Sequence, residues 1–235
     1  MNNNKMIILI TGTRKGIGLK LSEYYLSLGH TVIGCSRAES DLSHANYSHY
    51  CLDVSNEQQV NDLFLNIRKT YGHLDVLINN AGMASMNHIL LTPYSTVQKL
   101  FDTNFTGTFL FSRQAVKLMR KNKFGRVINF STVAVPLNLE GEAIYAASKC
   151  AIEQFSRILS KEVASMGITV NTIGPTPIET DLIKAVPKNK IEELLQQQGI
   201  KRLGHFEDVI NVIDFYINPN SNFISGQTIY LGGVF

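Results

Sequence analysis

The chain has 235 residues, of which 44% are hydrophobic and 17% charged, and its formal net charge is +3. A chain of this length and apolar content can bury a sizeable core, and we expect one α/β domain over residues 1–235. The positive charge is not gathered into a block, so the sequence favours neither a nucleic-acid partner nor a membrane surface.

The N-terminal segment and the cysteines indicate the cellular compartment in which the protein is expected. The apolar run from Met6 to Ile10 has five residues, too short for a signal-peptide core or a membrane span. Cys35, Cys51 and Cys150 are odd in number and lack metal-ligand spacing, and their apolar or small-residue surroundings predict buried, reduced thiols. We therefore expect a cytoplasmic protein without a bound metal.

Short apolar runs alternate with amphipathic helical patterns along the whole chain. Continuous apolar runs such as KMIILIT are typical of strands covered on both faces, and the alternation predicts a doubly wound, mostly parallel sheet. In such sheets, ligands bind beyond the carboxyl ends of the strands. The expected strands are 5–11, 30–36, about 49–54, 74–80, 125–131, 167–173 and 225–231, and the expected helices are 17–28, about 56–71, 95–120, 143–166 and about 190–198.

Two stretches depart from this rhythm. Residues 38–49 are polar and lack helical periodicity, so the helix usual between the second and third strands is expected to be shortened or missing. Residues 174–205 begin GPTPIETD and contain a polar helical segment. This second stretch is predicted to form a mobile lid.

A glycine-rich turn, TGTRKGIG at 11–18, joins the first strand to its helix. Gly12 suits the tight turn, Gly16 allows the backbone to approach a pyrophosphate, and Gly18 allows close packing of helix and strand. Glycine turns alone are weak evidence, and a plain strand-to-helix turn is the alternative. The position between a strand and a helix favours dinucleotide binding.

The end of the second strand bears on coenzyme preference. An enzyme that prefers NAD usually has an acid there for the ribose 2′-hydroxyl, whereas this chain has Ser36 and Arg37. The guanidinium of Arg37 suits a 2′-phosphate, and Arg14 and Lys15 add positive charge nearby. NADP(H) is therefore predicted over NAD(H), with an ordinary solvated arginine as the alternative for Arg37.

Tyr145 and Lys149 are four residues apart in an expected helix, so their side chains share one face. A nearby ammonium lowers the pKa of a phenol and makes it a usable acid or base. A YxxxK pattern alone is common by chance. Here it follows a strand ending in Ser131 and Thr132, and one of these hydroxyls could hold a carbonyl oxygen while hydride and proton are transferred.

The chain resembles the classical short-chain dehydrogenase/reductase family over essentially its whole length. The residues that carry the resemblance are Thr11-Gly12-x-x-x-Gly16-Ile17-Gly18, Asp53, Asn79 to Gly82, Asn104, Tyr145-x-x-x-Lys149, Pro175, Ile178 and Thr180. The resemblance implies a three-layer α/β/α Rossmann fold with a seven-stranded sheet and a homodimer or homotetramer built on the two long helices. It also implies that Tyr145 is the general acid/base.

The resemblance assigns further roles at the cofactor. Lys149 would lower the pKa of Tyr145 and bond the nicotinamide ribose, and Asn104 would support a proton relay. The cofactor would be flanked by Asp53 and Val54 at the adenine, by Asn80, Ala81 and Gly82 along its length, by Pro175 and Ile178 after the sixth strand, and by Thr180 at the nicotinamide amide or pyrophosphate. Asp53 could instead cap the following helix.

Three departures from the family pattern remain. Thr132 occupies the position of the usual serine, with Ser131 one residue earlier, Thr176 replaces the glycine after Pro175, and YLGGVF lacks an acid before its glycines. Because side chains alternate along a strand, Ser131 should point away from Thr132, which makes Thr132 the favoured hydroxyl unless a bulge intervenes.

The predicted function is NADP(H)-dependent interconversion of a ketone or aldehyde and an alcohol. A dinucleotide-binding sensor or scaffold without catalysis is the alternative, motivated by Thr132. Glu140 and Glu142 are expected to be surface carboxylates. The sequence does not identify the substrate.

Overall fold

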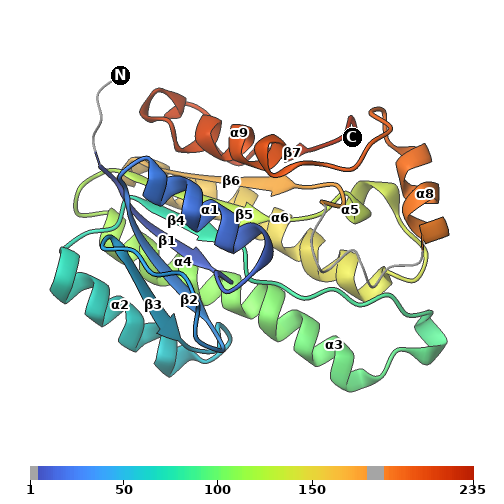
Figure 1. The fold of residues 1–235 in the computed structure, drawn as a ribbon, viewed down its shortest axis with the longest axis horizontal. Helices are drawn as coiled ribbons and strands as arrows, with labels where there is room; N and C mark the ends of the chain where they lie inside the picture. The colour runs from blue at the N-terminus through green and yellow to red at the C-terminus, as the bar shows by residue number, and fades with distance from the viewer. Residues whose placement is uncertain (1–4, 179–187) are drawn as a thin grey trace.

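The computed structural model describes residues 5–178 and 188–235. Within these, seven strands form one sheet in the order β3-β2-β1-β4-β5-β6-β7, and every neighbouring pair is parallel (Figure 1). All the carboxyl ends therefore meet at one edge. The strands are β1 Ile7–Thr11, β2 Thr31–Ser36, β3 Tyr47–Cys51, β4 Val76–Asn79, β5 Gly125–Phe130, β6 Ile168–Gly174 and β7 Thr228–Tyr230.

Helices connect the strands, and local signals set their ends. At the start of α2 the Asn56 side chain accepts a hydrogen bond from the Gln59 N–H, and Gly72 ends the helix at φ 78°. The α-helices are α1 Gly16–Ser27, α2 Glu57–Tyr71, α3 Tyr94–Leu100, α4 Gly107–Met119, α5 Ala134–Leu137, α6 Ala143–Val163, α8 Lys188–Gln197 and α9 Phe206–Ile217. Shorter elements are the 3-10 turns η1 Ile89–Leu91, η3 Ala164–Met166 and η4 Pro219–Ser221, and a π-helical turn, η2 Phe101–Thr106.

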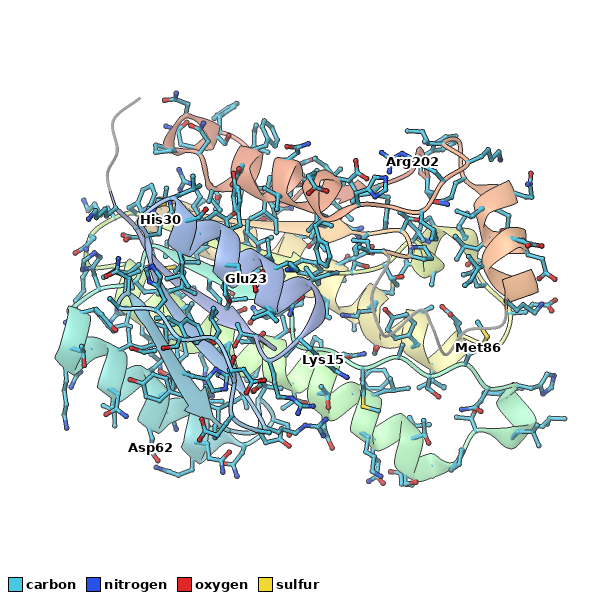
Figure 2. All side chains as sticks on the ribbon, in the orientation of Figure 1. Lys15, Glu23, His30, Asp62, Met86 and Arg202 are labelled. Carbon is cyan, nitrogen blue, oxygen red and sulfur yellow. The ribbon has the colours of Figure 1, made fainter. Side chains whose placement is uncertain are left out.

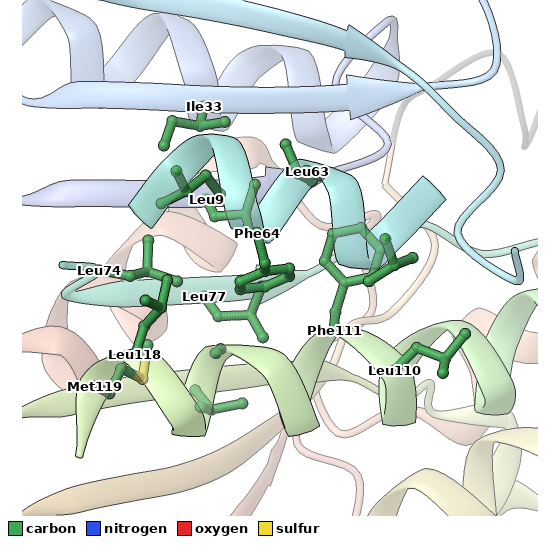
Figure 3. Close-up of a cluster of buried hydrophobic side chains, with 14 of the residues drawn as sticks. Leu9, Ile33, Leu63, Phe64, Leu74, Leu77, Leu110, Phe111, Leu118 and Met119 are labelled. Carbon is green, nitrogen blue, oxygen red and sulfur yellow. The ribbon is translucent and has the colours of Figure 1, made fainter. Parts of the chain in front are cut away.

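The helices cover both faces of the sheet and make three layers. In β1, Leu9 packs on the face covered by α2 and α4, while Ile8 and Ile10 pack on the face covered by α1 and α9. Figure 3 shows the first cluster, in which Phe64 of α2 and Phe111 of α4 meet edge to face. The predicted doubly wound Rossmann-type fold is confirmed.

The structure also bears on the irregular segments. Residues 37–46 contain no helix, as predicted. The single helix expected over 95–120 is instead divided into α3 and α4 by the π-helical turn η2. Helix α9 was not predicted, although its buried side chains at helical spacing are a readable signal: Val209, Ile213, Tyr216 and Ile217.

The prediction of three buried thiols is wrong for two of them. Cys35 is buried in β2, but Cys51 and Cys150 are exposed. Cys51 ends the edge strand β3, and Cys150 lies on the outer side of α6. Among the described residues, no helix is both long and apolar enough to cross a membrane.

Candidate active site

The glycine-rich turn is held by close backbone packing. Gly12 has φ +76°, and a Cβ there would lie 2.9 Å from the Asn80 amide nitrogen. A Cβ at Gly18 would lie 2.3 Å from the Gly12 carbonyl oxygen, so both positions require glycine. Gly16 has φ +61°, and a Cβ there would meet nothing within 4 Å, so the turn borders open space at this residue.

The N-terminus of α1 suits an anion. Lys15, the N-cap residue, makes no capping hydrogen bond with its side chain, and the first turn contains no acid. Arg14 and Lys15 are exposed in the glycine-rich turn, and Figure 2 shows Lys15 at the start of α1. Ile17 instead packs against the core between α1 and the sheet.

The segment after β4 is hydrogen-bonded to the glycine-rich turn. The Asn80 amide donates to the carbonyl oxygens of Thr11 and Gly12 at 2.8 and 3.3 Å, and the Ala81 N–H donates to the Thr11 hydroxyl at 2.9 Å. The polar groups of this segment therefore hold the turn in place. At Gly82, a Cβ would lie 3.2 Å from Asn104 Oδ1 and 3.3 Å from Lys149 Nζ, so this glycine brings those two side chains close together.

Arg37 and Asp53 lie at the expected adenosine end. Arg37 is exposed, and the Ser55 hydroxyl and, more weakly, the Arg37 guanidinium hold the pKa of Asp53 below its usual value. Asp53 accepts from the Ser55 N–H, whereas the side-chain cap of α2 comes from Asn56, so Asp53 is not the cap. Val54 is buried against Gly107 of α4.

Around the segment that lacks a helix, between β2 and β3, the side chains form a polar network that the sequence did not predict. His49 Nε2 lies 3.0 Å from the Ser36 hydroxyl and 3.1 Å from the Ala38 carbonyl oxygen, and Nδ1 lies 2.8 Å from the Tyr47 hydroxyl. The Tyr47 hydroxyl donates to Thr13 of the glycine-rich turn at 3.0 Å. The ends of β1 and β2 are thereby joined beside Arg37.

Tyr145 lies on the first turn of α6 beside Thr132. The pKa of Tyr145 is raised to about 12: burial raises it most, a hydrogen bond with the Thr132 side chain lowers it, and the charge of Glu142 raises it. Burial also raises the pKa of Glu142, which is partly buried rather than a surface carboxylate as expected. The prediction of a lowered phenol pKa is therefore not met by the protein's own residues.

Lys149 is one helical turn beyond Tyr145 and is buried. Its ammonium donates to the Phe130 carbonyl oxygen at the end of β5, at 2.9 Å. Burial lowers the pKa of Lys149 to about 8. Because the ammonium faces this carbonyl, it does not offset the effect of burial on the phenol.

Asn104 lies in the π-helical turn and is fully buried. Its amide nitrogen donates to the Met83 carbonyl oxygen and the Ser148 hydroxyl, both at 3.0 Å, and its Oδ1 accepts from the Met83 N–H at 2.9 Å. Ser148 in turn donates to the Tyr145 carbonyl oxygen at 2.7 Å. Such turns are frequent at functional sites, and this one joins the segment after β4 to the helix that carries Tyr145.

The two candidate hydroxyls differ in their partners. The Ser131 hydroxyl donates to the carboxylate of Glu153, whereas the Thr132 hydroxyl accepts from the Ala134 N–H at 3.2 Å and lies beside Tyr145. Strand β5 ends at Phe130, so the expected alternation does not apply, and both side chains contact α6. The geometry favours Thr132, for a reason other than the predicted one.

Of the three residues predicted after β6, two are described. The Pro175 carbonyl oxygen accepts from the Val133 N–H at 3.2 Å, which joins this segment to the one carrying Thr132. Ile178 is buried and pairs with Gly204 in an isolated parallel bridge, so it contributes packing. Thr180 lies outside the described residues, as do the other residues of the range 179–187 in the predicted lid.

A family model and several known proteins match most of the length of this chain. The family model described as short chain dehydrogenase matches residues 6–191. The 3-oxoacyl-[acyl-carrier-protein] reductase FabG of Salmonella typhimurium is 32% identical over 97% of this chain and 96% of its own, and that of Escherichia coli is 32% identical over 99% and 98%.

Solved structures agree in fold. A structure of ElxO with NADP bound is 30% identical, with a TM-score of 0.89, and the match covers 97% of this chain and 98% of ElxO. The aldohexose dehydrogenase of Thermoplasma acidophilum, 24% identical with a TM-score of 0.89, matches in fold alone. Since both the family model and the relatives match most of its length, this chain belongs to the short-chain dehydrogenase family of oxidoreductases.

Proposed function

We propose that this oxidoreductase interconverts a ketone or aldehyde and an alcohol with NADP(H), and that Tyr145 is its general acid/base. The observation that carries the proposal is the meeting of Tyr145, Thr132, Lys149 and Asn104 at the edge of the sheet that also holds the glycine-rich turn. In such a reaction the phenol can transfer a proton to or from the carbonyl oxygen, and the hydroxyl can hold that oxygen by a hydrogen bond.

In the proposed mechanism NADP(H), when bound, would supply or accept the hydride. The Thr132 hydroxyl donates a hydrogen bond to the carbonyl oxygen, and the Tyr145 phenol gives that oxygen its proton during reduction. The phenol is protonated at neutral pH, as proton donation to the carbonyl oxygen requires, although its raised pKa makes it a weaker acid than a free phenol. Asn104 accepts from the Met83 N–H beside Gly82, and the buried ammonium of Lys149 also lies close to Gly82.

Several features fit a phosphorylated dinucleotide. The open space at Gly16 and the acid-free first turn of α1 suit a pyrophosphate, and Arg37, Arg14 and Lys15 supply exposed positive charge at the expected position of a 2′-phosphate. Ser36 adds a hydroxyl there, which the network around His49 holds in place.

The coenzyme assignment predicts a selective effect of Arg37→Ala. Loss of a charge-assisted hydrogen bond should weaken NADPH binding by about 10- to 100-fold, while NADH binding changes by about twofold or less. Dissociation constants from coenzyme fluorescence titrations measure both. Arg68→Ala, which removes an exposed charge from α2, is the matched control, and an equal loss for both coenzymes would contradict the 2′-phosphate assignment.

The hydroxyl assignment predicts that Thr132→Val loses activity although its shape is kept. Removing a donor to the reacting oxygen should lower kcat/KM by about 10²-fold, and Thr132→Ser should restore most of it. Steady-state rates of NADPH oxidation give the comparison. A fully active Thr132→Val enzyme would show that this hydroxyl does not hold the substrate.

The alternative function, a sensor or scaffold without catalysis, is separated from the enzyme by turnover. We expect the wild-type protein to oxidise NADPH in the presence of at least one member of a carbonyl panel. The panel begins with a 3-oxoacyl thioester, because the FabG relatives are named for that substrate class, and continues with aldoses and simple ketones. Tight NADPH binding without turnover on any member would favour the sensor.

The remaining expectations are part of the proposal. The segment 174–205 would act as a substrate lid, of which α8 is described. A homodimer or homotetramer is supported by the exposed apolar side chains of Phe109 on α4 and Ile158 on α6. A cytoplasmic location stays a prediction from the sequence.

A further inference from the structure

Glu153 is a buried carboxylate beside the candidate active site. It lies two helical turns beyond Tyr145 on α6 and is 2% exposed. Its Oε1 accepts hydrogen bonds from the Ser131 hydroxyl at 2.5 Å and from the Tyr230 hydroxyl at 2.6 Å. A buried carboxylate destabilises a fold unless its oxygens are satisfied.

The partners of Glu153 come from the ends of two strands. Ser131 follows β5, Tyr230 ends β7, and β6 lies between those strands. Gly174 of β6 makes the crossing possible, because a Cβ there would lie 2.3 Å from the Tyr230 ring. One carboxylate on α6 therefore joins the carboxyl ends of β5 and β7 across β6.

A simple ion pair does not account for this burial. The only cation paired with Glu153 among the described residues is Arg157, at 3.4 Å, and its side chain is 50% exposed. Pairs with a solvated arginine contribute about 1 kcal/mol or less to stability. The two short hydroxyl contacts are the principal interactions of the carboxylate.

The hydrogen bonds around Ser131 connect Glu153 to the reacting groups. The Ser131 N–H donates to the Ile173 carbonyl oxygen at 2.7 Å, and the Val133 N–H donates to Pro175 at 3.2 Å. Thr132 lies between these two fixed residues. The backbone is thus held on both sides, and Glu153 holds the Ser131 side chain. The Thr132 hydroxyl accepts from the Ala134 N–H at 3.2 Å and lies beside Tyr145.

We propose that Glu153 is a positioning residue that, by accepting the Ser131 hydroxyl, keeps the Thr132 hydroxyl in register with the Tyr145 phenol. The proposal rests on the proposed function, in which Thr132 and Tyr145 act on the carbonyl oxygen. In this proposal Ser131 supports the position of Thr132 and does not bind the substrate.

Two replacements at Glu153 test whether its acceptor oxygen is what matters for catalysis. Glu153→Gln keeps an acceptor oxygen for both hydroxyls, so its kcat should stay within about threefold of wild type; Glu153→Ala removes the acceptor, so its kcat should fall by about tenfold or more. The NADPH dissociation constant should change by about twofold or less in both variants, because the glycine-rich turn is untouched. A purely structural Glu153 would lower Tm while leaving kcat at wild-type level.

A double-mutant cycle identifies the path through Ser131. Ser131→Ala should lower kcat in the wild-type background and have almost no further effect in Glu153→Ala, because both changes break the same contact. Ser156→Ala is the matched control: this buried serine on α6 bonds Asn129, so its loss should affect Tm without affecting kcat. Additive effects of Ser131→Ala and Glu153→Ala would overturn the proposal.

A crystal structure of Glu153→Ala tests the same point without turnover. We expect the distance between the Thr132 hydroxyl and the Tyr145 phenol to be longer than in the wild-type protein, and an unchanged distance would overturn the proposal. A wild-type protein that reduces no carbonyl would count against the proposed function alone, because the position of Thr132 in the variant is still decided by the crystal structure.

Discussion

Replacing Tyr145 with phenylalanine is expected to lower kcat by about 10²- to 10⁴-fold, the usual contribution of general acid–base catalysis. The phenol is the group beside Thr132 that can give a proton to the substrate oxygen, and phenylalanine keeps the ring while removing the proton. NADPH binding should hardly change, because the turn from Gly12 to Gly18 and the exposed Arg37 are unaffected.

The experiment compares single-turnover rates of NADPH oxidation with coenzyme titrations on the same preparations. Tyr94→Phe is the matched control, because Tyr94 is exposed at the start of α3. A Tyr145→Phe enzyme that retains more than about a tenth of the wild-type rate would exclude the phenol as the proton donor.

Replacing Lys149 with methionine is expected to lower activity and raise stability together. Burial lowers the pKa of Lys149 from 10.5 to about 8. This shift corresponds to about 3 kcal/mol of destabilisation when the lysine is charged in the folded state. Loss of the hydrogen bond to Phe130 cancels about 1 kcal/mol, so the variant should gain on the order of 1–2 kcal/mol at pH 7.

The sign of the pH dependence follows from the two pKa values. Below pH 8 the lysine is protonated in both folded and unfolded chains, and the full cost of a buried charge applies. Between about pH 8 and 10.5 the unfolded chain holds the proton and the folded chain does not, so wild-type stability rises with pH. The advantage of Lys149→Met should therefore be largest below pH 8 and vanish above about 10.5.

Denaturant unfolding at pH 7 and pH 10 measures this difference, with Lys161→Met on the exposed side of α6 as the control. We expect kcat/KM of Lys149→Met to fall by about 10²-fold in parallel, which would be a trade of stability for function. Equal stability gains at both pH values would show that packing, rather than the buried charge, is responsible.

The sequence by itself determined the parts of this protein that follow from local patterns. Continuous apolar runs specify buried strands, helical periodicity specifies the helices between them, and glycine is required where a positive φ coincides with the close approach of another segment, as at Gly12. The four-residue spacing of Tyr145 and Lys149 likewise places both on one face of α6. The glycine-rich turn and this pair were therefore readable without any knowledge of long-range contacts.

Only the tertiary structure decided which side chains lie in contact and how burial shifts their pKa values. Ser131 and Thr132 are neighbours, and what distinguishes them is Glu153, which is 22 residues from Ser131 and 77 from Tyr230. The raised pKa of Tyr145 and the lowered pKa of Lys149 come from burial, which depends on how the strands and helices pack. Desolvation and contacts between distant segments leave no periodic pattern in a single sequence, so they emerge only once the chain is folded.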